Sequence, residues 1–359
     1  MRPEPSARFG GLWARELSEV TDDLGVLDRD GRWAVLLPYR GRPVLARFEH
    51  WTADEPPGAR RDWAGPSTDS WTSSASAAEY VAAVARTREA IAAGSVYQAN
   101  VCRVLSAPLP DATRADVGGL DGLLAEGNPA PFGGFLRLPD DDVAVATASP
   151  ELFLRVRREE HGRVVRSGPI KGTATTPDRL LPKDRAENVM IVDLVRNDLS
   201  RVCQTGTVTV PSLLRVEEHP GLVHLVSEVA GLLRPECAWS DLIDATFPPG
   251  SVTGAPKVAA LELIEQLEPV PRGPYCGAVG WVDATTGEAE LAVAIRTFWV
   301  ADGHLHFGTG AGITWGSDAW AEWGETELKA ARLTEVAAGT WHAGAVADSH
   351  DSPRQEGRR

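Results

Sequence analysis

Short apolar runs recur along most of the chain and predict β-strands. The predicted strands cover 33–37, 43–48, 96–105, 133–138, 143–147, 163–167, 207–216, 222–231, 276–283, 289–299 and 304–309. Many of these runs stand in adjacent pairs joined by short turns, which favours antiparallel pairing over a doubly wound parallel sheet.

Longer segments with helical periodicity lie between the strands. One helix is predicted to begin after Ser76, a plausible N-cap, and to stop at Gly94. Further helices are predicted over 178–202, 239–246, 254–267 and 318–338.

Three regions follow from these patterns and from local composition. Residues 1–75 contain strands and a Pro/Gly/Ser-rich linker, and residues 76–340 carry the alternating helices and strands. Residues 341–359 have hardly an apolar side chain and are expected to be disordered.

Composition limits the classes of partner and compartment. The 359 residues include 36 basic and 50 acidic ones, and a net charge of −14 argues against nucleic acid or an anionic membrane as partner. No run approaches the ~20 apolar residues of a bilayer span, and the first residues resemble no signal peptide. Four cysteines without metal-type spacing fit reduced thiols, so a cytoplasmic protein is expected.

Two pairs of acidic residues stand at helical spacing. In the first, Asp184 and Glu187 share a helix face with Asn188, and in the second Glu322 and Glu325 are three residues apart. Paired carboxylates suit a hard divalent cation, although acidic side chains at a helix start also have a purely structural explanation.

Other segments could bind an anion. Gly310 and Gly312 belong to a glycine-rich run after a strand, where backbone N–H groups could approach an anion closely. Ser251 lies in a Gly/Ser/Thr segment before a predicted helix, and Arg296 interrupts an apolar strand, where a buried charge needs a partner. An ordinary turn or helix cap remains an alternative for the glycine and serine segments.

Taken together, these segments resemble the chorismate-utilising enzymes. The resemblance covers about residues 76–338 and is carried, in order, by VYQANVCR, SPELFL, PIKGT, DRAENVMIVDLVRNDLSRV, HLVSEV, PGSVTGAPK, CGAVGW, AIRTF, GAGI and EWGETELKA. It implies an α+β fold in four α/β/β/α layers, with two large, mostly antiparallel sheets packed face to face and helices outside. It also implies chorismate as substrate and magnesium as cofactor.

Two positions discriminate within the family. Gln98 stands where the water-using members resemble one another in carrying a lysine base, and glutamine cannot remove a proton from water. Lys171, in PIKGT, is similar to the lysine of aminodeoxychorismate synthases, whose proposed mechanism uses the lysine amine as a covalent nucleophile. The resemblance is therefore closest to component I of aminodeoxychorismate synthase, which makes 4-amino-4-deoxychorismate for p-aminobenzoate and folate.

The resemblance implies roles for further residues. Glu151 matches the general acid and His224 the active-site histidine. Glu187 and Glu325 match direct magnesium ligands, whereas Glu322 and Asp184 match water-mediated or outer carboxylates. The positions that match substrate-binding residues are Gln98, Thr173, Ser251, Tyr275, Arg296, Gly310, Ala311, Gly312 and Lys329.

Two departures from the family pattern concern regulation and the ammonia source. The N-terminal region lacks the Leu-Leu-Glu-Ser stretch of tryptophan-sensing members, so inhibition by tryptophan is not expected. No Gly-x-Cys-x-Gly nucleophile elbow occurs, so ammonia is expected from a separate glutamine amidotransferase subunit. An anthranilate synthase large subunit and a non-catalytic chorismate-binding protein remain alternatives.

Overall fold

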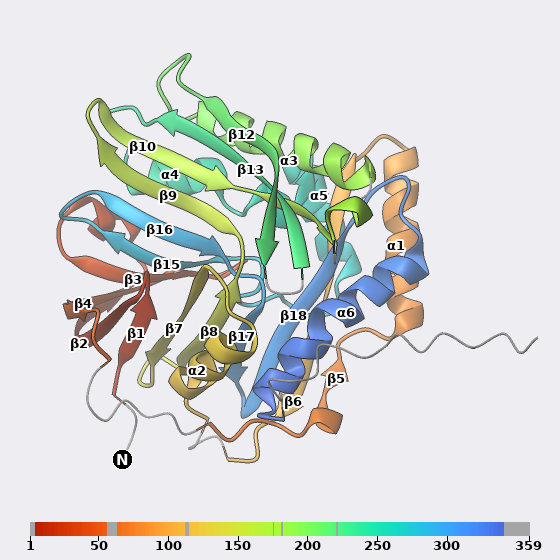
Figure 1. Ribbon diagram of the computed structural model, residues 1–359, viewed down its shortest axis with the longest axis horizontal. Helices are drawn as coiled ribbons and strands as arrows, with labels where there is room; N and C mark the ends of the chain where they lie inside the picture. The colour runs from red at the N-terminus through yellow and green to blue at the C-terminus, as the bar shows by residue number, and fades with distance from the viewer. Residues whose placement is uncertain are drawn as a thin grey trace, which may run out of the picture.

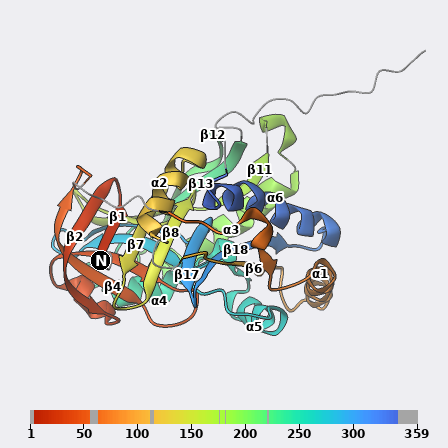
Figure 2. The same ribbon diagram turned by 90° about the horizontal axis from the view of Figure 1, so that it is seen from below.

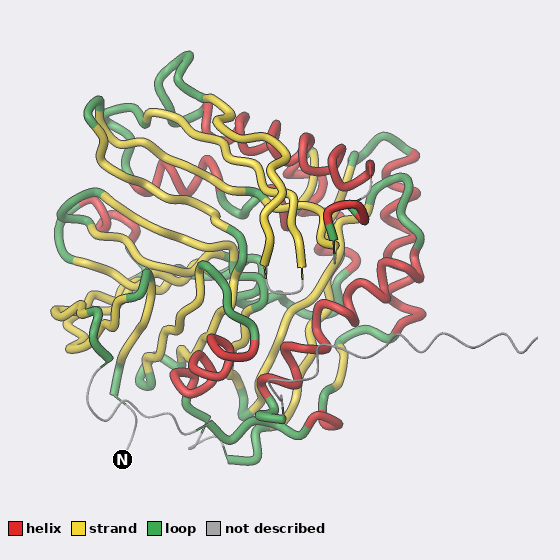
Figure 3. Tube along the Cα trace, viewed as in Figure 1, coloured by secondary structure: helices red, strands yellow, loops and turns green. Residues whose placement is uncertain are grey.

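In the part of the chain that the structure describes, 18 strands form one hydrogen-bonded network with helices around it (Figure 1). The computed structural model describes residues 4–55, 63–111, 115–174, 176–180, 182–219 and 222–340. Every strand pair recorded in this part of the chain is antiparallel. The predicted α+β class with mostly antiparallel pairing is therefore confirmed, and Figure 3 shows the helices grouped outside the strands.

One half of the network is built around two long strands. In order, it contains β5 (Thr72–Ser73) and β14 (Gly254–Ala255) against β6 (Gln98–Pro108), then β18 (His304–Ile313), β17 (Thr297–Ala301), β8 (Val143–Ser149) and β7 (Phe132–Leu138). The β6–β18 pair runs over ten residue pairs, from His304 opposite Pro108 to Ile313 opposite Ala99.

The other half ends in three strands close to a long helix. It contains β15 (Ala278–Asp283), β16 (Glu288–Val293), β9 (Leu152–Glu159), β10 (Gly162–Gly168) and β13 (Leu222–Leu232), with β11 (Ile170–Ala174) and β12 (Thr209–His219) also paired to β13.

The N-terminal strands join these two halves. The joining strands are β1 (Ser6–Phe9), β2 (Leu12–Thr21), β3 (Arg32–Leu37) and β4 (Val44–Thr52). β1 pairs with β7 at one end, and β3 pairs with β15 at the other. The main apolar core contains buried side chains from both halves and from these joining strands, such as Leu136, Leu154 and Trp33.

Helices cover the network on both sides (Figures 1 and 2). In the first half, α2 (Val117–Gly127) packs against β7 and β8, α6 (Ala319–Ala337) against β18, and α1 (Ala77–Ala92) and α5 (Lys257–Leu267) against β6. In the second, α3 (Pro182–Ser200) packs against β11 and β13, and α4 (Trp239–Thr246) packs on α3. The start of α1 at Ser76 is confirmed as a capping box with Glu79.

Three sequence predictions need correction. The strand predicted over 289–299 is two strands, because Arg296 adopts a left-handed backbone (φ 51°) that ends the regular pairing. The helix predicted from residue 254 begins at Lys257, since Gly254–Ala255 pairs with β6 and Pro256 is the N-cap. The helix predicted from 178 begins at Pro182, after a 3-10 turn over Pro177–Arg179.

Candidate active site

The side-chain amide of Gln98 is buried next to Ala99, where the pairing of β6 with β18 ends. Gln98, the first residue of β6, is 1% exposed, and neither its Nε2 nor its Oε1 has a hydrogen-bond partner in the described part of the chain. A methyl group on Gly312 of β18 would lie 2.7 Å from this Nε2. A buried unsatisfied amide is costly, so this position fits a group that meets a ligand.

Lys171 of β11 approaches the same glycine from the other half of the network. Its Nζ would lie 3.6 Å from a methyl group on Gly312, and it donates a hydrogen bond to the carbonyl oxygen of Ser251 at 2.9 Å. Ser251 is buried in the 3-10 turn Gly250–Val252. The fold thus brings Gln98, Lys171 and Ser251 together although they are far apart in sequence.

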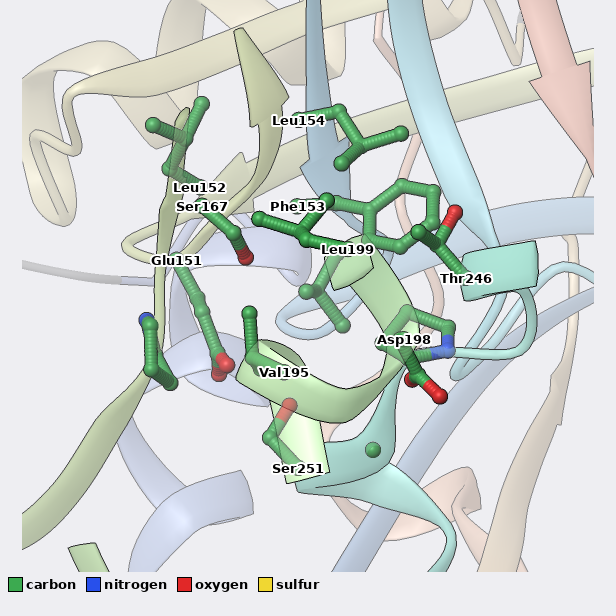
Figure 4. Close-up of a pocket in the computed structure, with 14 residues that line it drawn as sticks. Glu151, Leu152, Phe153, Leu154, Ser167, Val195, Asp198, Leu199, Thr246 and Ser251 are labelled. Atoms are coloured by element: carbon green, nitrogen blue, oxygen red, sulfur yellow. The ribbon is translucent and has the colours of Figure 1, made fainter. Parts of the chain in front are cut away.

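Glu151 lies next to this group, between β8 and β9. Burial raises the pKa of its carboxyl, and hydrogen bonds from Ser251 and the Ile170 backbone, with the Lys171 ammonium, only partly offset that rise. Figure 4 shows Glu151 and Ser251 at one end of a small cavity whose other end is formed by Phe153 and Leu154. A carboxyl whose pKa is raised by burial retains its proton more readily than an exposed glutamate and is suited to donating one.

Carboxylates from α3 and α6 face the Lys171 side of the site. Burial raises the pKa of Glu187, with further upward contributions from Glu322 and Asp184, against the opposing effect of Lys171 and Lys183. Glu322 is 4% exposed, and burial together with Glu325 raises its pKa, although Ser317 donates a hydrogen bond to it. Negative charge from two helices therefore converges here.

Glu325 differs from the other two glutamates. Burial favours its neutral form, but the ammonium groups of Lys329, Lys183 and Lys171 outweigh burial and hold its pKa below the usual range. The Lys329 Nζ lies 2.6 Å from Glu325 Oε1 and donates a hydrogen bond to the carbonyl oxygen of Gly310 at 3.0 Å. Lys329 thus ties α6 to β18 beside the site.

The donor set fits a hard divalent cation that is shared with a ligand. Carboxylate oxygens are what magnesium prefers, and it commonly uses one or two protein carboxylates together with substrate oxygens. Among the described residues, no three His, Cys, Asp or Glu side chains are close enough to hold a metal by themselves. Glu187 and Glu322 repel each other, and a cation shared between them would relieve that repulsion.

Two of the predicted residues lie on the sheet close to Lys171. His224 of β13 is buried and stands opposite Thr173 of β11, while Leu225 stands opposite Lys171. The Thr173 backbone belongs to β11, but its side chain lies outside the described residues. Ala311 is buried in β18, between the two predicted glycines.

Tyr275 is buried and Arg296 is half-buried, and burial shifts their pKa values in opposite directions. The Tyr275 ring covers Gly308, where a methyl group would lie 2.0 Å from the ring, and burial raises its pKa well above the usual range. Burial lowers the pKa of Arg296, and no carboxylate of the described chain offsets that loss of solvation. The expected contact of Arg296 with an anionic ligand stays a prediction.

The structure also shows what the sequence reasoning missed. Asn188, expected on the face of Asp184 and Glu187, is fully buried: it donates to the carbonyl oxygen of Leu225 at 3.0 Å and accepts from the Ser227 hydroxyl at 2.5 Å. It holds α3 on β13. Conversely, Lys183 acts on the pKa of all three glutamates and was not singled out.

A second, larger cavity of about 450 Å³ lies near the N-terminal strands. Its lining includes the Arg8–Asp121 ion pair, Asn128, Arg155 and Glu290. None of the predicted site residues lines it, so the two cavities are separate features.

Comparison with known proteins identifies the family of this chain. A family model described as chorismate binding enzyme matches residues 44–335. Anthranilate synthase component 1 of Streptomyces coelicolor is 43% identical over 75% of this chain, which spans only 53% of that relative. Aminodeoxychorismate synthase component 1 of Klebsiella aerogenes is 36% identical over 91% of this chain and 73% of the relative.

Solved structures agree in fold. An isochorismate synthase described as 2,3-dihydroxybenzoate-specific, from Bacillus anthracis, superposes with a TM-score of 0.76 at 24% identity, over 93% of this chain and 96% of that one. Anthranilate synthase component I of Streptococcus pneumoniae gives 0.74 at 24% identity, over 93% and 91%. None of the helices among the described residues has the length and apolar character that a bilayer span requires. The extent of the family match and the identity to its curated members establish that this chain belongs to the chorismate-binding enzymes.

Proposed function

We propose that this protein is component I of aminodeoxychorismate synthase and converts chorismate and ammonia into 4-amino-4-deoxychorismate. The observation that carries the proposal is the convergence of a lysine amine and a buried acid: Lys171 bonds to the backbone of Ser251, whose side chain bonds to Glu151. A nucleophile and a proton donor are thereby held beside one another.

The two groups support a covalent route. The Lys171 amine attacks carbon 2 of the ring, the carbon 4–oxygen bond breaks as the double bond shifts, and the Lys171 nitrogen gives its extra proton to the carboxylate that Glu151 becomes. Glu151 protonates the departing hydroxyl, which leaves as water. Ammonia then forms the bond to carbon 4 as the double bond shifts back and the carbon 2–nitrogen bond breaks, and the proton lost by the new amino group goes to the departing Lys171 nitrogen.

Gln98 supports ammonia rather than water as the second nucleophile. Its buried amide is not a base, so it cannot activate water, but its unpaired Oε1 could accept a hydrogen bond from ammonia. Because ammonia is nucleophilic as the free base, it needs orientation rather than deprotonation.

Magnesium, when bound, would supply charge neutralisation for a substrate carboxylate. Glu187 and Glu325 would hold it directly, with Glu322 and Asp184 in outer positions. Arg296 and Lys329 would bind substrate anions, and the remaining contacts would come from Ser251, Tyr275, Thr173, Ala311, Gly310 and Gly312. His224 would be the third catalytic residue, together with Lys171 and Glu151.

The proposal includes a partner and a cellular setting. Ammonia would come from a separate glutamine amidotransferase subunit, as the designation component 1 of several relatives supports. The product would lead to p-aminobenzoate in the cytoplasm.

Product identity tests the proposal. The protein incubated with chorismate, ammonium and magnesium should yield a species with the mass of aminodeoxychorismate and no fluorescent anthranilate. Lys171→Ala should abolish or redirect amination at carbon 4 while chorismate binding, followed by quenching of tryptophan fluorescence, stays largely intact. Unchanged aminodeoxychorismate formation by this variant would refute the covalent role of Lys171.

Anthranilate synthesis is the second candidate, favoured by the 43% identity to an anthranilate synthase component. Anthranilate as the main product would replace the first proposal with this one. A third candidate is a non-catalytic chorismate-binding protein, and any sustained chorismate turnover eliminates it.

A further inference from the structure

A buried ion pair lies in the chain between α5 and β15, among residues to which no role has been given so far. The Arg272 guanidinium forms two parallel hydrogen bonds with the Glu268 carboxylate, from Nε to Oε2 at 2.8 Å and from Nη2 to Oε1 at 2.6 Å. The Arg272 and Glu268 side chains are 1% and 8% exposed. Because lost hydration offsets much of the attraction in a buried pair, net stability alone explains its presence poorly.

The pair takes the place of a neighbouring strand along one edge of β6. β14 pairs with the first two residues of β6. Farther along, the backbone N–H of Cys102 donates to Glu268 Oε1 at 2.9 Å, and Arg272 Nη2 donates to the carbonyl oxygen of Asn100 at 2.7 Å. These side chains thereby satisfy buried backbone groups of β6. The pair is thus attached to the strand that begins with Gln98.

The same guanidinium also holds the turn that contains Ser251. Its Nη1 donates to the carbonyl oxygen of Val252, the residue after Ser251 in the same 3-10 turn, at 2.8 Å. The carbonyl oxygen of Ser251 accepts the hydrogen bond from Lys171. One planar group, that of Arg272, therefore connects the backbone beside Ser251 with the strand of Gln98.

These contacts depend on the shape of an arginine side chain. The four hydrogen bonds of Arg272 leave from three nitrogens that are fixed in one plane. A lysine would keep the charge opposite Glu268, but its single nitrogen could not reach the carboxylate and both backbone carbonyls in this geometry. The arrangement therefore fixes positions as well as pairing charges.

We propose that Arg272, held by Glu268, is a positioning residue that fixes the turn of Ser251 against the start of β6. It thereby sets the separation between the Lys171 amine and the Gln98 amide. The inference deepens the proposed function, because it rests on these two groups acting on one substrate. Since Arg272 acts through the backbone of its neighbours, its loss should affect the rate of reaction more than the binding of chorismate.

Arg8→Lys is a matched control for the test variant Arg272→Lys. Arg8 also forms two parallel hydrogen bonds with a buried carboxylate, that of Asp121, at 2.6 and 2.7 Å. This pair lines the second cavity, which none of the predicted site residues lines. Both substitutions should lower the urea concentration at the midpoint of unfolding, because each replaces a planar fork with a single ammonium group.

Steady-state kinetics of chorismate consumption should separate the two variants. The full chain is assayed with saturating ammonium and magnesium, at a temperature at which circular dichroism shows every variant to be folded. Arg272→Lys should lower kcat about 10²-fold and change the KM for chorismate less than about threefold, because a small misplacement of reacting groups slows the reaction. Arg8→Lys should retain the wild-type kcat and KM.

Three results would overturn the positioning role. They are a wild-type kcat in Arg272→Lys, an equal fall of kcat in Arg8→Lys, and a KM that rises in step with the fall of kcat. The last two would indicate a general loosening of the fold. Glu268→Gln, which removes the charge that holds Arg272, takes the place of Arg272→Lys if the latter does not fold, and it should show the same difference between kcat and KM.

Product analysis of the wild type keeps the two proposals apart. Anthranilate as the main product would refute the proposed function, while the comparison of kcat and KM would still decide whether Arg272 positions the site. Aminodeoxychorismate formation together with a wild-type kcat in Arg272→Lys would refute only the positioning role. A wild type that consumes no chorismate would overturn both proposals.

Discussion

Glu151 and Glu325 are both glutamates of one site, yet their surroundings move their pKa values in opposite directions. Burial dominates at Glu151, whereas three ammonium groups outweigh burial at Glu325. The same side-chain chemistry thereby suits Glu151 to the proposed role of proton donor and Glu325 to that of anionic ligand. The difference between the two pKa values follows from position and not from residue type.

The raised pKa of Glu151 predicts a pH dependence. In the proposed mechanism its protonated form releases the hydroxyl as water, so the rate should fall as the pH rises through the pKa of Glu151, which lies above that of an ordinary glutamate. Glu151→Gln should lower kcat/KM about 10²–10⁴-fold and remove this alkaline limb. A pH profile of kcat/KM with saturating magnesium measures both effects, and an identical profile in the variant would exclude the role.

Removal of one ligand charge predicts a change in metal requirement. Glu325→Gln should raise the magnesium concentration for half-maximal activity about tenfold or more. Glu335→Gln, an exposed change on the same helix, is the control and should leave the titration unaltered. A wild-type magnesium titration in Glu325→Gln would argue that Glu325 is not a ligand.

Single residues were foreseen where a local motif contains them. Gln98, Lys171 and Glu151 come from three separate segments, and the fold brings them close together, while their roles stay predictions. The hydrogen bonds that Asn188 makes to β13 and to Ser227 were not predicted, because helical spacing alone does not tell which face of a helix meets a sheet. Lys183 was missed although the scarcity of lysine could have indicated it.

Among the elements, β18 shows how a strand accommodates a site. Gly308, Gly310 and Gly312 alternate, so their missing side chains leave one face of the strand open to Tyr275, Cys102 and Gln98. Each glycine therefore has a different neighbour and a different expected sensitivity to substitution.

Two substitutions in β18 should separate activity from stability. Gly312→Ala meets the movable end of Gln98, so it should cost about 10²-fold in activity with little loss of stability. Gly308→Ala meets the Tyr275 ring at 2.0 Å and should lower the free energy of unfolding by about 1–3 kcal/mol. Urea denaturation and steady-state kinetics measure the two effects, and equal stability losses would contradict this distinction.

Helices and strands with a strong local pattern of apolar and polar residues were predicted best. The helix predicted over 239–246 coincides with α4, and that over 318–338 differs from α6 by one residue at each end. In contrast, α2 was missed because its glycines are poor helix formers, and packing of Leu120 and Leu124 on Phe135 overrides that preference. β9, in which arginines separate apolar residues, was also missed.

On the scale of the whole molecule, the N-terminal strands link the two halves of the strand network by backbone pairing. β1 continues the sheet from β7, and β3 continues it to β15, so the strands of residues 6–52 connect the two halves. The division at residue 75 was based on composition, which carries no information about pairing between distant strands. The division into an N-terminal region of strands and linker over 1–75 and a catalytic domain over 76–340 stays a prediction.

Deletion of residues 1–52 tests this arrangement. The shortened chain should not unfold cooperatively and should aggregate, because the edges of β7 and β15 lose their partners. Circular dichroism during thermal unfolding and size-exclusion chromatography measure the outcome. A soluble, monomeric fragment with chorismate turnover would show instead that the remainder folds independently.

The pairing of β3 with β15 also affects how the chain is synthesised. Val35 emerges from the ribosome early, but its partner Gly280 follows 245 residues later. At about 5–20 residues per second, the first strands wait roughly 12–50 s with an open, apolar edge. Nascent chains of this protein should therefore depend on chaperones that shelter the N-terminal strands until β15 arrives.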